Sequence, residues 1–287
     1  MASRSNTLSK RVKEQEIVEE VHHRQGPPLT KKEIASRERK RYLGFVLIPA
    51  CMFVLLVFGE MLNRMFSSEG ILRQMTMEDL QGFWFFIAGC VCWLAMLWCR
   101  LKPTLAYVFA HEITHALAAK ASLGEIHDMH ISRSGGYVET NKTNWFITLA
   151  PYLVPLYTLI VFALLELGRA FYNVDYAYPL ALGAWHPHLK AAWIFYYWIG
   201  LTWSFHVSFT WEVLKTEQSD LLHNGEFFSL LLIFGANLGI LVALFFLASP
   251  KFTFHDLWLD VQSGGAIIWD VIAFVFQTVY HILRNDG

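Results

Sequence analysis

The feature that most constrains the fold is a series of long apolar runs, each near the length of a membrane-crossing helix. A bilayer core is spanned by roughly 20 residues of α-helix. Six runs approach this length, and a seventh, which carries Asp270 and His281, is predicted either to cross the membrane or to lie along its surface. The six are residues 43–62, 82–101, 104–121, 145–167, 190–211 and 227–248, and the seventh is 264–283. The chain is therefore predicted to be an all-α polytopic membrane protein with six to seven transmembrane helices.

The composition agrees with a membrane-embedded chain. Only 16% of the 287 residues are charged and 55% are hydrophobic, whereas soluble globular chains carry roughly 25% charged residues. All four cysteines lie inside apolar runs, and we interpret them as small buried side chains rather than as metal ligands. The formal net charge of −1 gives no indication of a partner. The apolar runs make the lipid bilayer the expected partner, and nucleic acid is not expected.

The first 42 residues differ from the rest of the chain. They hold eleven Lys and Arg against six Glu, and the basic run 37–41 directly precedes the first apolar run. Basic residues beside a membrane span stay on the cytoplasmic side. We therefore predict a basic cytoplasmic N-terminal tail, and the short loops favour a bacterial inner membrane.

One apolar run, residues 104–121, carries ionisable side chains at a spacing that indicates a metal site. On a helix, His111 and His115 project from the same face, at a separation suited to one zinc ion. Glu112 lies about 100° around the axis from His111, where it can accept a proton from water without being a ligand. His-Glu-x-x-His is the arrangement of zinc hydrolases, and ionisable residues in apolar segments mark function because they are costly there. The alternative is two helix histidines that only form hydrogen bonds inside a bundle.

The segment after this run changes its periodicity. Residues 126–140 alternate loosely, contain β-formers and include a Gly135-Gly136 turn, which predicts a short β-hairpin at the mouth of the site. An exposed edge of that hairpin, around Gly135, Gly136 and Tyr137, is expected to bind an extended substrate backbone. An ordinary linker is an equally good interpretation, because the alternation is imperfect. The next run contains Pro151 and Pro155, which free backbone carbonyls and bend the helix.

These features together resemble the site-2 protease family of intramembrane zinc metalloproteases. The similarity rests on His-Glu-Ile-Thr-His-Ala at 111–116, the glycine hairpin and the proline-broken span, and it covers roughly residues 104–235. It implies that His111 and His115 bind Zn²⁺ and that Glu112 is the catalytic base. It also implies an Asp ligand in an Asn- and Pro-containing motif ending Leu-Asp-Gly, and that motif is absent here.

The third zinc ligand must therefore be inferred, because a catalytic zinc site needs three protein ligands and an open position. Asp220, between two predicted spans, is the first choice, because its neighbourhood is the closest analogue of the family's Asp segment and carboxylates are ordinary zinc ligands. The alternative is an Asp that caps the following helix. His206, deep in the run 190–211, is the second choice, either as a ligand or as a group that binds the substrate oxyanion. Simple alternation of spans puts Asp220 on the membrane face opposite the start of the 104–121 helix, and the sequence offers no resolution.

The residues predict a buried zinc hydrolase, and the resemblance narrows it to a protease acting on membrane-protein or peptide substrates. The predicted organisation is a basic tail (1–42), two scaffold transmembrane helices (43–103), a zinc metalloprotease core (104–250) and an amphipathic or membrane-spanning C-terminal helix (251–287). Two other classes compete. A non-catalytic membrane scaffold that retains a zinc-site remnant is favoured by the missing motif and opposed by Glu112, because a structural site needs no base. A transporter fits the spacing of the motif poorly.

Overall fold

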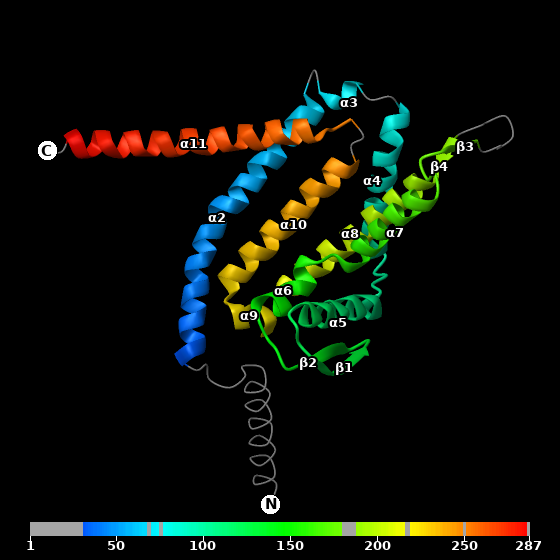
Figure 1. Ribbon diagram of the computed structural model, residues 1–287, viewed down its shortest axis with the longest axis horizontal. Coiled ribbons are helices and arrows are strands. Elements are labelled where there is room, and N and C mark those ends of the chain that lie inside the picture. The colour runs from blue at the N-terminus through cyan, green and yellow to red at the C-terminus, as the bar shows by residue number, and fades with distance from the viewer. Residues whose placement is uncertain are drawn as a thin grey trace, which may run out of the picture. The chain divides into compact units, whose positions relative to one another are not determined.

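The computed structural model describes residues 31–67, 70–74, 77–179, 188–215, 219–248 and 251–285. This part of the chain is mostly helical, with two small two-stranded sheets (Figure 1). The elements in chain order are α2 (Lys31–Phe66), α3 (Ile71–Gln74), α4 (Met77–Trp98), α5 (Thr104–Ala121), β1 (Ile126–Ser132), β2 (Gly135–Thr140), α6 (Trp145–Leu153), α7 (Leu156–Phe171), β3 (Ala177–Pro179), β4 (His188–Lys190), α8 (Ala191–Leu214), α9 (Ser219–Asn224), α10 (Glu226–Ala248) and α11 (Phe254–Asn285). The chain divides into two compact units, Met1–Lys40 and Arg41–Gly287, and the packing described below belongs to the second.

Four described helices are long and apolar enough to cross a membrane, which is consistent with an integral membrane protein. Their apolar stretches are Glu38–Phe66, Leu80–Trp98, Glu226–Leu247 and Phe254–Thr278. A fifth span results if α6 and α7, which are bent by 68° at the break between them, cross together. The prediction of six to seven spans was therefore too high for this part of the chain.

Two predicted spans account for the difference. The run 104–121 forms α5, but His111, Glu112 and Lys120 make this 18-residue helix too polar to qualify. The run 190–211 forms α8, whose Trp, Tyr and His206 side chains lower its mean hydropathy below that of the candidate spans. At the N-terminal end, α2 begins at Lys31, inside the predicted tail, because the Lys, Arg and Glu residues there are good helix formers. The predicted tail before residue 31 lies outside the described residues.

The helices α4 and α8 pack against each other through two glycines. A Cβ on Gly89 would lie 2.0 Å from the Tyr197 carbonyl oxygen, and a Cβ on Gly200 would lie 2.1 Å from the Phe86 carbonyl oxygen. Only glycine permits this approach of two backbones, as in packed membrane helices generally. Further along the pair, the indole nitrogen of Trp93 donates a hydrogen bond to Ser208 (2.8 Å).

This packing makes α4 and α8 end on the same side of the second unit. Lys102, which follows α4, forms an ion pair of 2.7 Å with Glu212 in the last turn of α8. Because α5 starts directly after Lys102 and α9 follows α8, the Asp220 segment returns to the same end as α5. Figure 1 shows α5, α6, α9 and the hairpin gathered there. The conflict found by simple alternation disappears, because α4 and α8 run in the same direction and α5 is not among the candidate membrane spans.

The predicted hairpin is present, and the linker interpretation is wrong. β1 and β2 pair antiparallel, with Ser132 opposite Gly135. The turn is therefore formed by Arg133 and Ser134, and not by the two glycines, which begin β2. Gly135 has a φ of 146°, a backbone conformation that favours glycine. The strands β3 and β4 form a second antiparallel pair.

Candidate metal centre

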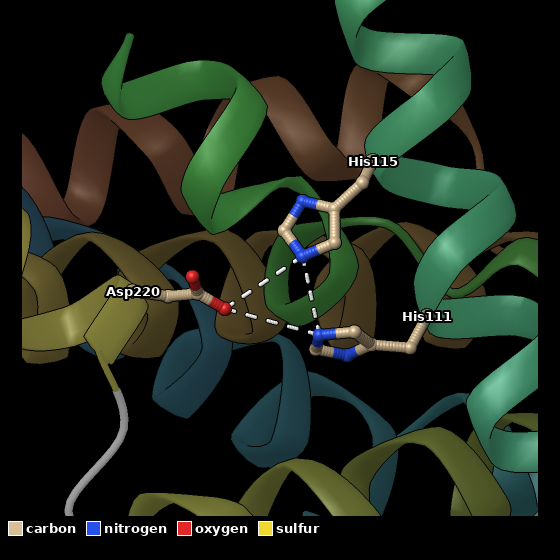
Figure 2. A group of neighbouring side chains, drawn as sticks. All are labelled: His111, His115 and Asp220. Carbon is tan, nitrogen blue, oxygen red and sulfur yellow. Dashed lines mark hydrogen bonds and ion pairs between the residues drawn. The ribbon is translucent and has the colours of Figure 1, made fainter. Parts of the chain in front are cut away.

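Three side chains from two distant segments converge beside the middle of α5. His111 and His115 lie one helical turn apart, with 3.2 Å between their Nε2 atoms. The Oδ2 atom of Asp220, from α9, is 3.8 Å from the Nε2 of His111 and 3.6 Å from that of His115 (Figure 2). Over the described ranges, this is the one group of three or more His, Cys, Asp or Glu side chains found to be placed for a metal ion, with ligand atoms within 4.8 Å of one another.

These residues fit a zinc ion in donor type and in spacing. Zinc binds imidazole nitrogens and carboxylate oxygens at about 2.0–2.2 Å, so tetrahedral ligand atoms lie about 3.4 Å apart. The separations of 3.2, 3.6 and 3.8 Å bracket this value. Two histidines and one carboxylate form a ligand set of catalytic zinc sites, in which the fourth position stays open.

Each ligand is held by a partner that the sequence analysis did not identify. The Nδ1 atom of His115 is 2.8 Å from the carbonyl oxygen of Ile147, and the Nδ1 atom of His111 is 3.3 Å from the hydroxyl of Tyr107. The Tyr152 hydroxyl donates a hydrogen bond of 3.1 Å to the Asp220 carboxylate. Partners of this kind orient metal ligands and affect metal affinity.

Asp220 is positioned by the packing and hydrogen bonding of α9. The neighbouring Leu221 is buried in an apolar cluster with Leu149 of α6 and Phe228 of α10. At the end of α9, the buried Asn224 amide donates hydrogen bonds to the backbone oxygen of Asp220 (3.2 Å) and to Thr148. Burial opposes ionisation of Asp220, but the hydrogen bonds and charges of His111 and His115 outweigh it and hold the pKa of Asp220 below its ordinary value.

Glu112 lies under the hairpin and is only 6% exposed. A Cβ on Gly136 would lie 2.7 Å from the Cγ atom and 3.0 Å from the Oε1 atom of Glu112. The same Cβ would lie 2.6 Å from the His130 carbonyl oxygen, so only glycine fits between the Glu112 side chain and β1. The hairpin therefore restricts where the Glu112 carboxylate can lie.

The three ligand residues and Glu112 line one cavity of about 550 Å³. Of the residues predicted to bind substrate, Gly135, Gly136 and Tyr137 line this cavity. Tyr137 is 51% exposed, and its hydroxyl donates a hydrogen bond of 2.6 Å to Asp128 across the hairpin. That bond lowers the pKa of the exposed Asp128 carboxyl below its ordinary value.

His206 is not brought to this cavity or to the ligand cluster. It lies on α8 and lines a separate cavity of about 20 Å³ on another side of His111. Its Nε2 atom is buried without a hydrogen-bond partner among the described residues. Of the two candidates for the third ligand, the geometry brings Asp220, and not His206, to His111 and His115.

No protein-family model, curated protein or solved structure matches this chain. The class of the protein therefore rests on its own fold and site: a helical membrane protein with a His-His-Asp cluster beside a buried glutamate.

Proposed function

We propose that the protein is a zinc metalloendopeptidase of the site-2 protease kind, which hydrolyses peptide bonds of membrane proteins or peptides at the membrane. The observation that carries the proposal is the cavity in which His111, His115 and Asp220 lie together with Glu112. Three ligands and a separate carboxylate are what a hydrolytic zinc site requires, whereas a structural site fills its fourth position with protein.

Zn²⁺ held by His111, His115 and Asp220 would supply a Lewis acid and lower the pKa of water to about 7. The Glu112 carboxylate would accept a proton from the attacking water and pass it to the amine nitrogen of the leaving group. Its burial and its contact with Gly136 restrict its conformations, so little ordering is needed when substrate binds.

The hairpin would bind the substrate as an extended strand. Among the described residues β1 and β2 pair only with each other, so each strand has an outer edge at which another chain would pair. Gly135, Gly136 and Tyr137 of β2 line the cavity, which brings part of this sheet to the ligands. An extended backbone exposes its carbonyl groups to attack, whereas a helix keeps them in internal hydrogen bonds.

The cavity would lie at the edge of the membrane rather than at its centre. It lies at the end of α4 and α8, and α5 is not among the candidate membrane spans. With the basic N-terminal segment in the cytoplasm, this edge would be the cytoplasmic one, in keeping with a bacterial inner membrane.

Zinc content and cleavage, measured on the detergent-purified full-length protein, test the proposal. We expect about one zinc ion per chain in wild type and in His206→Ala, and loss of zinc in Asp220→Ala. We also expect cleavage of a peptide that contains a membrane span, blocked by a chelator and restored by added zinc. Absence of zinc after purification without chelator would overturn the proposal. Bound zinc without cleavage of any membrane-span peptide would instead support a non-catalytic scaffold.

A further inference from the structure

A proline inside α6 leaves one backbone carbonyl of that helix without its usual partner. In an α-helix, each N–H bonds to the carbonyl four residues earlier, and proline has no N–H. Pro151 therefore withholds the hydrogen bond that the carbonyl of Ile147 would otherwise accept from within the helix. A buried carbonyl in this situation needs a donor from elsewhere.

The donor is the imidazole of His115, one of the three side chains proposed to bind the metal. Its Nδ1 atom lies 2.8 Å from the Ile147 oxygen. Because a carbonyl oxygen can only accept, the Nδ1 atom of His115 must carry the hydrogen. In the neutral ring this leaves an unprotonated Nε2, the atom that faces His111 and Asp220.

Two further contacts, one of its N–H and one of its side chain, hold Ile147 in place. The Ile147 N–H donates a hydrogen bond of 2.9 Å to the side chain of Asn144, which caps the start of α6. The Ile147 side chain is 4% exposed and packs in a cluster with Ala118 and Ala119 of α5. These small residues let α6 approach the helix that carries His115.

We infer that Pro151 is a positioning residue for the metal centre, which reserves the Ile147 carbonyl for His115 and so fixes the tautomer that presents Nε2 to the ion. The inference rests on the proposed zinc site. With alanine at position 151, a helical N–H would compete for the same carbonyl. A carbonyl has two lone pairs, so the bond to His115 would be weakened rather than lost. Loss of such a partner lowers metal affinity by about 10- to 100-fold, and we expect the lower end.

Pro155 offers a matched control, because the alternative role of Pro151 is only to bend the chain. Pro155 precedes α7, at the 68° break itself. The helical N–H that Pro155 lacks would pair with the carbonyl of Pro151, four residues earlier. The ring nitrogens of His115 and His111 contact other groups, Ile147 and Tyr107. Pro155→Ala therefore alters the break without adding a competitor at Ile147.

The test compares wild type, Pro151→Ala and Pro155→Ala as full-length proteins in detergent. Zinc affinity is measured by competition with a chelator, and the His115 tautomer by ¹⁵N NMR of the metal-free, histidine-labelled protein, assigned with His115→Gln. We expect Pro151→Ala to weaken zinc binding about 10-fold and to add the Nε2–H tautomer, with both unchanged in Pro155→Ala.

Equal zinc affinity in all three proteins, or a loss confined to Pro155→Ala, would overturn the inference while leaving the proposed zinc site intact. If wild type binds no zinc, the proposed function fails, and the His115 tautomer becomes the only test of the inference. Loss of the Nδ1–H tautomer of His115 in Pro151→Ala would support the inference. The same tautomer in both proteins would contradict it. If Pro151→Ala does not fold, wild type still decides, because an Nε2–H tautomer of His115 there would rule the inference out.

Discussion

The α4–α8 pair and the metal centre are formed by adjacent segments of the chain, but the contacts within each region are of different kinds. In the pair, two backbones touch at Gly89 and Gly200, and Trp93 is buried to 1% exposure against aromatic rings of α8. At the centre, polar side chains meet around a cavity through hydrogen bonds between segments far apart in sequence. One region is filled and the other is hollow.

The two kinds of contact predict different effects of substitution on stability and on zinc chemistry. A close-packed interface tolerates little change in volume, so substitutions there alter the free energy of unfolding. Buried polar groups cost stability unless they are paired, so the polar cluster around the cavity is expected to contribute less to folding than the close-packed interface does. We therefore expect substitutions in the α4–α8 pair to change stability and not zinc binding, and substitutions at the centre to change zinc binding or cleavage and not stability.

The largest effect is expected at Glu112. Glu112→Gln preserves the shape of the side chain but removes the base, so cleavage should fall by about 10²- to 10⁴-fold with zinc content and thermal unfolding unchanged. The matched control is Glu212→Gln at the end of α8, which loses only the exposed ion pair with Lys102 and should retain activity. Cleavage rates of both variants check the prediction, and an active Glu112→Gln would remove the role given to this residue.

The next effect tests the filled region. In Gly200→Ala the new methyl would lie 2.1 Å from the Phe86 carbonyl oxygen, so α4 and α8 must separate, at an expected cost of about 1–3 kcal/mol or more. Gly239→Ala in α10, where a Cβ meets nothing within 4 Å, should instead be neutral or stabilising by up to about 1 kcal/mol. Thermal unfolding in detergent measures both. Equal stability of the two variants would contradict the close packing, and zinc lost from folded Gly200→Ala would contradict the separation of the two regions.

Local patterns predicted those parts of the molecule that depend on neighbouring residues. His111, Glu112 and His115 share one helix, so their relative placement follows from the helical repeat alone. The hairpin follows from alternation, although its turn lies two residues earlier than expected and Gly136 instead lies against Glu112. Asp220 is the first choice because its neighbourhood is the closest analogue of the Asp segment that the resemblance implies and because carboxylates bind zinc, and the fold brings it to the histidines.

Tertiary contacts explain what the sequence did not predict. The span count was too high because run length ignores the polarity of α5 and the aromatic character of α8. The partners Ile147 and Tyr152 are separated from His115 and Asp220 by 32 and 68 residues, and no local pattern marks them. Pro151 was recognised as a residue that frees a carbonyl, but only the packing of α6 on α5 identifies the group that uses it.

A smaller effect is expected where the hairpin meets the base. Gly136→Ala would place a methyl 2.7 Å from the Glu112 Cγ atom and displace the carboxylate, and misplacement of a catalytic group by about 1 Å costs up to about 10²-fold in rate. We expect cleavage to fall by about 10- to 100-fold while zinc content stays unchanged. Gly265→Ala in α11, where the added Cβ meets nothing, is the control. Undiminished cleavage by Gly136→Ala would show that the hairpin does not constrain Glu112.

The smallest effect concerns the exposed side of the hairpin. The Tyr137 hydroxyl bonds to ionised Asp128 and lowers the pKa of that carboxyl, so its contribution to hairpin stability is present above the ordinary aspartate pKa and lost as pH falls through the lowered value. In Tyr137→Phe the Asp128 pKa should rise toward its ordinary value, because the largest of the contacts that lower it is lost, as measured by NMR titration of the carboxyl carbon. Zinc content should not change, because neither residue belongs to the ligand cluster. Identical titration of Asp128 in both proteins would show that the hydrogen bond does not form in solution, and the hairpin would then depend on its backbone pairing and its contact with α5 alone.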